Sequence, residues 1–304
     1  MARLSAVDLL PDVFEVEDQG TLGSCTANAG LSALELMYKR AGDPRDFSRL
    51  YLYYWERANM GLKGDTGADP RQITKVLIER GVCLEETWPY DPALLDVPPS
   101  AAAEAEAPQY RIHAAEFIQL AIADLDTIIE RIRGSLCAGI PVLQTSLITQ
   151  SFMVLRGQRD WRTHTFSMAT GETNQVLGSH QTIIIGYDDA AQMFLCQNSW
   201  GPSWADGGFF GVPYSFMGNA WISQLWFITD AGVRAIPVPD AVPDVVPEVA
   251  PIPAPIIAPT VVTPEPVIPQ PAPLRQGQST ASAATPLVVA LVVLAVVLAL
   301  AHFL

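Results

Sequence analysis

The sequence predicts an α+β fold in which a helical lobe is followed by a strand-rich lobe. The first half of residues 1–235 carries apolar residues at helical spacing, and the second half carries short apolar runs between turn signals. Helices followed by strands are typical of an α+β layout. We place the helical lobe at about residues 12–105 and the β-rich lobe at about 108–235, with the crossover at "AAAEAEAP", residues 101–108.

Three helices are expected in the first lobe. The first covers Thr26–Arg40, where apolar residues recur at helical spacing until Gly42 ends the pattern. The second lies in "SRLYLYYWERANM" and the third in "RQITKVLIERG". Gly81, at the end of the third segment, is a typical residue just after a helix C-terminus.

The second lobe is expected to begin with a strand and one more helix. The stretch "APQYRIHAAEFIQLAIADLDTIIERIRGSLCAGIP" opens with a strand-like run, and a helix then starts near Asp124–Asp126. Five further strands follow, separated by turns such as "GYDDAAQ". Their sequences are "PVLQTSL", "HQTIIIGYDD", "MFLCQNSW", "GFFGVPY" and "LWFITD".

Composition excludes several classes of protein. The formal net charge is −14 and no basic stripe is present, so we expect no nucleic-acid partner. The N-terminus has no apolar signal-peptide core, so we expect free thiols in a reducing compartment. The cysteines show no CxxC pair or other metal-ligand spacing, and we expect neither a metal nor a cofactor. They are Cys25, Cys83, Cys137 and Cys196.

The composition changes after the globular domain. Residues 237–273 contain 13 prolines in 37 positions, and proline both lacks a backbone N–H and fixes φ. We therefore interpret residues 236–285 as an extended, disordered linker.

The end of the chain has the pattern of a membrane anchor. Residues 286–304 are apolar except for His302, and as a helix they are about as long as the ~30 Å hydrocarbon core of a bilayer. Arg275 on the N-terminal side predicts, by the positive-inside rule, a single-pass anchor with the globular domain in the cytosol. A virion or host-cell membrane would also fit if the protein is viral.

Cys25 stands where "GSC" runs directly into the first helix. The unpaired N–H groups and dipole of a helix N-terminus favour a thiolate, which is the nucleophilic form of cysteine. A nearby imidazolium would lower the thiol pKa further. His180, at the expected start of an apolar strand, is the candidate for that imidazole. Asn198 could orient its ring, and Trp200 could shield the pair from water.

Three segments resemble the signature blocks of papain-like cysteine peptidases. They are "DQGTLGSCTANA", "GSHQTIIIGYDD" and "NSWGPSWADGGFF", and they place His180 and Asn198 155 and 173 residues after Cys25. The resemblance implies that Cys25 is the nucleophile, that His180 is the base and acid, and that Asn198 holds the ring. It also implies that Gln19 donates to the oxyanion and that Trp200 packs over the Asn198–His180 bond. For the fold, the resemblance implies two lobes, of which the second is an antiparallel, barrel-like sheet.

The resemblance extends to "DTGADP". In this segment Gly67 resembles the strip that pairs with the substrate backbone, and Ala68 or Asp69 would help to wall the main specificity pocket. Two departures are notable, because Leu22 replaces a disulfide cysteine and Thr26 replaces a tryptophan that most members carry. The "SCTANA" variant is similar to a prokaryotic or viral branch. Only 18 residues precede Gln19, so we expect that the long inhibitory pro-segment of secreted members is absent.

We therefore expect a membrane-tethered thiol endopeptidase with peptide or protein substrates. One alternative keeps the same catalytic site but lets another amine replace water as the group that accepts the acyl chain from the enzyme, as in a transacylase or amidase. The other is a catalytically silent, membrane-anchored binding protein, which would be expected to lack one of the site residues. Gln19, Cys25, His180 and Asn198 are all present.

Overall fold

The computed structural model describes residues 4–118, 120, 123–155, 161–163, 174–218, 221–234 and 236–238, and it has the predicted α+β layout. The helices are α1 (Cys25–Arg40), α2 (Arg49–Asn59), α3 (Arg71–Glu79), α4 (Ala101–Glu106), α5 (Leu125–Cys137) and α6 (Gln150–Met153). The strands are β1 (Ala6–Asp8), β2 (Ala114–Ile118), β3 (Val142–Thr149), β4 (Val176–Asp188), β5 (Met193–Gln197), β6 (Phe209–Pro213) and β7 (Ile222–Asp230). Short 3-10 helices lie at Leu10–Asp12, Pro92–Leu94, Ala107–Tyr110 and Tyr214–Phe216.

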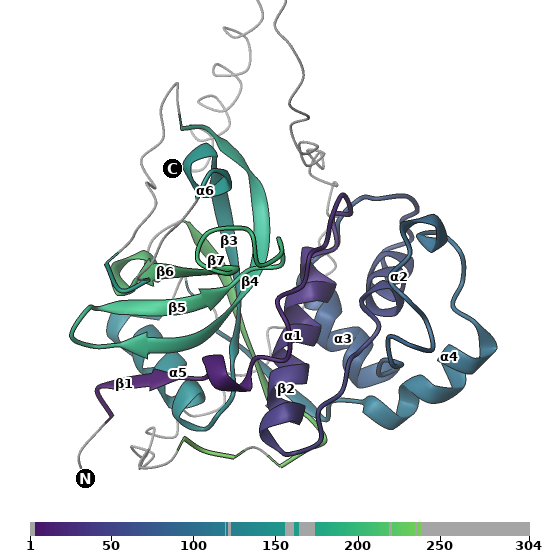
Figure 1. Cartoon of the computed structure of the whole chain (residues 1–304), viewed down its shortest axis with the longest axis horizontal. Helices are drawn as coiled ribbons and strands as arrows, with labels where there is room; N and C mark the ends of the chain where they lie inside the picture. Colours follow the sequence, from purple (N-terminus) through teal and green to yellow (C-terminus); the bar gives the residue numbers. More distant parts are fainter. Residues whose placement is uncertain are drawn as a thin grey trace, which may run out of the picture. The chain divides into compact units, whose positions relative to one another are not determined.

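The helix α1 lies in the middle of the molecule. Figure 1 shows it between the sheet and the group formed by α2, α3 and α4, and it contacts β4 on one side and α2 and α3 on the other. Both sides of the helix are therefore buried, including Leu34, Leu36 and Met37. A Cβ atom at Gly30 would lie 2.5 Å from Cγ2 of Ile73, so this glycine permits the close packing of α1 on α3.

The predicted helix ends agree closely with the structure. The carboxylate of Asp124 accepts a hydrogen bond from the Thr127 backbone N–H (2.9 Å), which caps α5 at the expected place. Gly81 follows α3 with a φ of +84°, and a Cβ atom there would lie 2.0 Å from the Ala107 carbonyl oxygen. The expected crossover at residues 101–108 is largely helical, because Ser100 caps α4 through the Ala103 N–H.

The strands form one antiparallel sheet. Its order is β2-β7-β3-β4-β5-β6, and β1 pairs with β4 outside this path. We predicted a barrel-like lobe, which requires the two outermost strands to hydrogen-bond to each other. Among the described residues β2 and β6 are not paired, so the sheet is open there.

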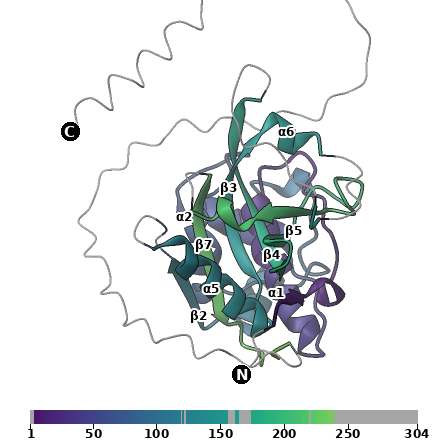
Figure 2. The ribbon, with the colours of Figure 1, turned by 90° about the vertical axis from the view of Figure 1, so that its left-hand side faces the viewer.

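Two terminal segments cross from one lobe to the other. The strand β1 comes before the helical lobe in sequence but pairs with β4 of the sheet lobe. Residues 236–238 come after the sheet, and the Arg40 guanidinium at the end of α1 donates to the carbonyl oxygens of Ile236 and Pro237. The Val238 N–H donates to the Cys137 carbonyl oxygen at 2.9 Å. These contacts tie the two lobes together at the end of α1 away from Cys25. Figure 2 shows the same ribbon turned by 90°.

The rest of the predicted linker and the predicted anchor at 286–304 lie outside the described residues. Within the described part of the chain, no helix combines the length and the apolar character needed to span a bilayer. The membrane anchor therefore stays a prediction.

Candidate active site

Cys25 is the first residue of α1. The side chain of Ser24, the residue before it, makes no capping hydrogen bond to the helix and instead lies 2.6 Å from the hydroxyl of Tyr90. The dipole and the N–H groups of the first turn therefore remain available to an anion at the sulfur. All four cysteines are free thiols, and Cys25 is half-buried, whereas Cys83 and Cys196 are fully buried.

His180 projects from β4 and is held by Asn198. The two side chains meet at 2.7 Å between Nε2 and Oδ1, and Oδ1 also accepts from the Ser199 backbone N–H at 2.8 Å. An oxygen that accepts two hydrogen bonds requires the proton of the imidazole to sit on Nε2. The other ring nitrogen, Nδ1, is buried and has no hydrogen-bond partner in the described structure. It is the atom left to exchange a proton with a neighbouring thiol.

The expected position of His180 at the start of its strand is wrong. The strand β4 begins four residues earlier, at Val176, because β3 extends to Thr149 and pairs with it. His180 therefore lies inside a paired strand, opposite Ser146 of β3. The next residue, Gln181, brings its backbone N–H to the Cys25 thiol. The thiol thus lies beside the strand residue that follows His180.

A group of aromatic rings covers the imidazole. Trp200 lies over His180 with ring centroids 4.6 Å apart and an interplanar angle of 31°. Phe152 of α6 lies 6.3 Å from the imidazole and 5.4 Å from Trp200, and Trp204 completes the group. Trp200 was predicted to shield the pair, but Phe152 was missed, since it belongs to none of the three sequence blocks. The rings exclude water from the His180–Asn198 bond and so strengthen it.

Gln19 is buried next to the same loop. Its Oε1 accepts from the Ser199 hydroxyl at 2.7 Å, and its Nε2 donates to the Leu22 carbonyl oxygen at 2.8 Å. These two bonds fix the amide, and one of its two N–H groups is left without a partner among the described residues. Ser199 therefore orients both predicted polar groups, Gln19 through its hydroxyl and Asn198 through its N–H.

Burial acts on both ionisable groups of the site. It raises the pKa of Cys25 to about 11, although the backbone N–H groups of Gln181 and Thr26 oppose this shift. It lowers the pKa of His180 to about 4, and the bond to Asn198 opposes that shift. Neither a lone thiolate nor a lone imidazolium is therefore favourable near neutral pH. The reactive state requires both charges together, each stabilising the other in a medium of low dielectric constant.

The predicted substrate strip is tied to the helical lobe. The Gly67 N–H donates to the Tyr53 hydroxyl at 3.0 Å, and that hydroxyl donates to Asp65 at 2.6 Å. Asp65 in turn accepts from the N–H of Gly23, two residues before Cys25, at 2.8 Å. The strip is thus fixed beside the start of α1. The Gly67 N–H already donates to Tyr53, so it is not free to bond to a substrate strand in this structure.

The two neighbouring residues have local partners. The carboxylate of Asp69 accepts from the Arg71 backbone N–H at 2.9 Å and pairs with the Arg71 guanidinium at the start of α3. Ala68 is half-buried against the core. The roles predicted for Gly67, Ala68 and Asp69 in substrate binding stay predictions.

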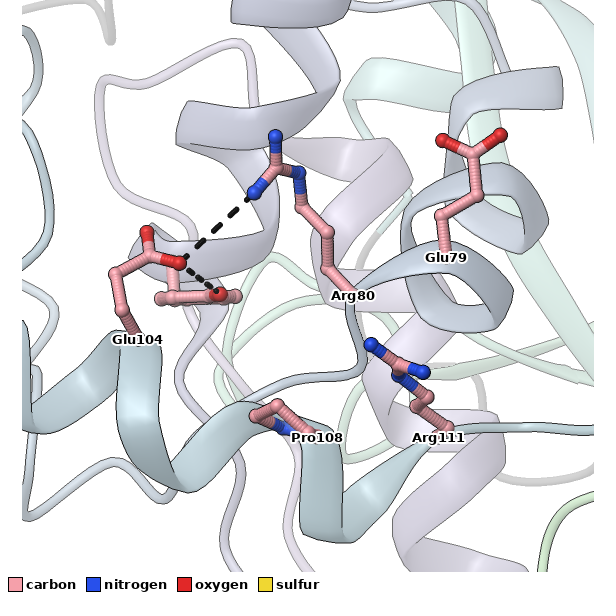
Figure 3. Close-up of a pocket in the computed structure, with 6 residues that line it drawn as sticks. Glu79, Arg80, Glu104, Pro108 and Arg111 are labelled. Carbon is pink, nitrogen blue, oxygen red and sulfur yellow. Dashed lines mark hydrogen bonds and ion pairs between the residues drawn. The ribbon is translucent and has the colours of Figure 1, made fainter.

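A separate cavity lies in the helical lobe. It has a volume of about 250 Å³ and none of the predicted site residues lines it. Figure 3 shows that Arg80 and Glu104 face each other across it, 3.9 Å apart, with Arg111 beside them. The described residues contain no group of three or more His, Cys, Asp or Glu side chains that could hold a metal ion.

The two lobes meet at the N-terminus of α1. The helical lobe supplies a half-buried thiol there, and the sheet lobe supplies an imidazole fixed by an amide and covered by rings. This architecture is that of a two-lobed cysteine peptidase.

Comparison with known proteins gives the family. The model for papain family cysteine proteases matches residues 6–224, and the chain belongs to this family. An uncharacterized peptidase C1-like protein of Acanthamoeba polyphaga mimivirus is 32% identical over 237 residues, covering 75% of this chain and 73% of the relative. That viral relative agrees with the branch predicted from "SCTANA".

Solved structures agree with this assignment. Xylellain, a cysteine protease from Xylella fastidiosa, matches with a TM-score of 0.63 and 29% identity, covering 75% of this chain and 86% of that one. A Carica candamarcensis cysteine protease in complex with E-64 matches with a TM-score of 0.55 and 21% identity, covering 75% of this chain and 99% of that one. The second likeness is evidence for the fold alone.

Proposed function

We propose that this protein is a thiol-dependent endopeptidase in which Cys25 is the nucleophile and His180 is the general base and acid. The observation that carries this proposal is the bond between His180 Nε2 and Asn198 Oδ1, because it leaves Nδ1 as the unpartnered ring atom. Membership of the papain family supports peptidase activity.

The proposed reaction has two halves. The Cys25 thiolate attacks the carbonyl carbon of the scissile bond, and the imidazolium of His180 gives its proton to the leaving amine, which leaves a thioester on Cys25. Water then attacks the thioester while His180 takes a proton from it. The Cys25 thiolate leaves the carbonyl carbon, the acid product departs, and the thiolate–imidazolium pair is restored. The free N–H of Gln19 and the Cys25 backbone N–H are the donors proposed to stabilise the oxyanion in both halves.

Product analysis distinguishes this reaction from acyl transfer to another amine. The full chain is incubated with a mixture of peptides, and the products are identified by mass spectrometry. Hydrolysis predicts pairs of fragments whose masses sum to the substrate plus one water. Products that are only ligated or transferred would instead identify a transacylase. The absence of any product would favour a binding protein.

We also propose that residues 286–304 tether the peptidase to a membrane through the linker at 236–285. The support is the apolar run and the proline content of the sequence. Location would then restrict activity to substrates at one membrane face. The test is fractionation of cells that express either the full chain or residues 1–235. We expect only the full chain in the membrane fraction, and equal distribution of the two would refute the tether.

A further inference from the structure

Directly behind the proposed nucleophile lies a carboxyl group with an unusual environment. Glu56 of α2 is 0% exposed. One carboxyl oxygen, Oε2, accepts a hydrogen bond from the Thr26 hydroxyl at 2.6 Å. The other oxygen, Oε1, is buried and has no partner in the described part of the chain. Thr26 is the residue after Cys25, in the first turn of α1.

Among the residues that the structure describes, no cation is bonded to this carboxyl group. The adjacent Arg57 directs every guanidinium nitrogen elsewhere, toward the carbonyl oxygens of Tyr53, Gly64 and Leu95 and the carboxylate of Asp96. A buried carboxylate with one neutral hydrogen bond is strongly disfavoured. Burial accordingly raises the pKa of Glu56 to about 8, while the Thr26 bond and the more distant Arg57 oppose the shift.

The charge state of Glu56 acts on Cys25. The titratable or charged groups that influence Glu56 are Arg57 on α2 and Asp69 before α3, and Asp69 is paired with Arg71. On α1, a negative charge on Glu56 raises the pKa of the Cys25 thiol. Ionisation of Glu56 therefore opposes the thiolate.

We propose that Glu56 is a positioning residue for the nucleophile: as a neutral acid it holds the first turn of α1 through Thr26, and as a carboxylate it weakens the Cys25 thiolate. This inference rests on the proposed function only in taking Cys25 as the nucleophile. It gives a physical role to Thr26, one of the two positions where the sequence departs from the pattern that it resembles.

The test compares wild type with Glu56→Gln, which keeps the shape and the hydrogen bond of the neutral acid. Alkylation of Cys25 by iodoacetamide is followed by peptide mass mapping between pH 6 and pH 10. The ratio of the variant rate to the wild-type rate is expected to be about 1 below pH 7 and to rise to about threefold or more above pH 9. A ratio that does not rise across the range would refute the proposal and leave the peptidase function intact. Absence of any Cys25 alkylation in wild type would instead refute the proposed function.

Two further variants separate this role from a structural one. In Thr26→Val the carboxyl group of Glu56 loses the hydrogen bond that lowers its pKa, so Glu56 should ionise at a higher pH than in wild type. The effect of that ionisation on the rate of Cys25 alkylation is therefore expected to begin at a higher pH. In Glu35→Gln the profile of Cys25 is expected to match wild type. Glu35 is also a fully buried acid, but it accepts from the Phe47 N–H at 2.9 Å and from Arg49 at 2.7 Å. The proposed link between Glu56 and Cys25 would be refuted if this effect began at the same pH in Thr26→Val as in wild type. It would also be refuted if Glu35→Gln changed the pH profile of Cys25 alkylation in the same way as Glu56→Gln.

Discussion

Replacing Cys25 with alanine is expected to reduce peptide hydrolysis by at least about 10⁴-fold. The thioester forms on this sulfur, and no other group at the start of α1 can replace it. The variant should fold normally, because the Cys25 side chain is only half-buried and makes no disulfide. The measurement is kcat/KM on a fluorogenic peptide, together with labelling by a thiol-directed epoxide.

Cys137 supplies the matched control for this experiment. It is the other half-buried thiol, and its sulfur lies 3.4 Å from the Tyr187 hydroxyl, at the end of α5. Cys137→Ala should keep wild-type hydrolysis and epoxide labelling within about twofold, because this change is remote from the proposed site. Labelling that survives in Cys25→Ala, or that disappears in Cys137→Ala, would place the nucleophile elsewhere.

Replacing His180 with glutamine is expected to have an effect of similar size. Without an imidazolium the thiol ionises alone, and burial then holds the pKa of Cys25 at about 11. At pH 7 only about one molecule in 10⁴ would carry the thiolate, so hydrolysis should fall by roughly 10³- to 10⁴-fold or more. The assay is the same fluorogenic peptide at pH 7.

His113 provides the control for His180. It is exposed, just before β2, and His113→Gln should leave the rate unchanged. A His180→Gln variant that keeps more than about a tenth of the wild-type kcat/KM would contradict the proposed proton transfer.

The strong local signals of the sequence were enough to predict the order and the approximate ends of the main helices. The α1 boundaries follow from helical spacing and from Gly42, and Gly81 marks the end of α3, since both are local properties of the chain. The position of the β4 start was missed. Its residues before His180 pair with the end of β3, and the short segment at 176–179 has no apolar run of its own.

The contacts around the site depend on tertiary structure. Ser199 was given no role of its own in the sequence analysis, although its hydroxyl donates a hydrogen bond to Gln19, 180 residues away in the chain. Phe152 lies 6.3 Å from the imidazole on α6, which packs against β3, and no periodicity in the sequence indicates that. The bond between Tyr53 and the Gly67 N–H likewise joins a helix to a loop whose path the sequence does not predict.

The charge environment was the least predictable feature. A glutamate on an amphipathic helix is most often solvated, and α2 carries Glu56 in the middle of a mixed sequence. Only the fold shows that this carboxyl group lies under Thr26 and away from every guanidinium nitrogen of Arg57.

The most direct test of the proposed catalytic pair is the pH dependence of Cys25 alkylation in the wild-type protein. Iodoacetamide reacts with the thiolate, so the rate from pH 4 to pH 11 reports how much of Cys25 is ionised. If His180 takes the proton of the Cys25 thiol, the thiolate should react with iodoacetamide at a substantial rate already between pH 5 and pH 8. Burial raises the pKa of Cys25 to about 11. A single rise in rate centred near that pH, with almost no reaction at neutral pH, would show that His180 does not take the proton of Cys25.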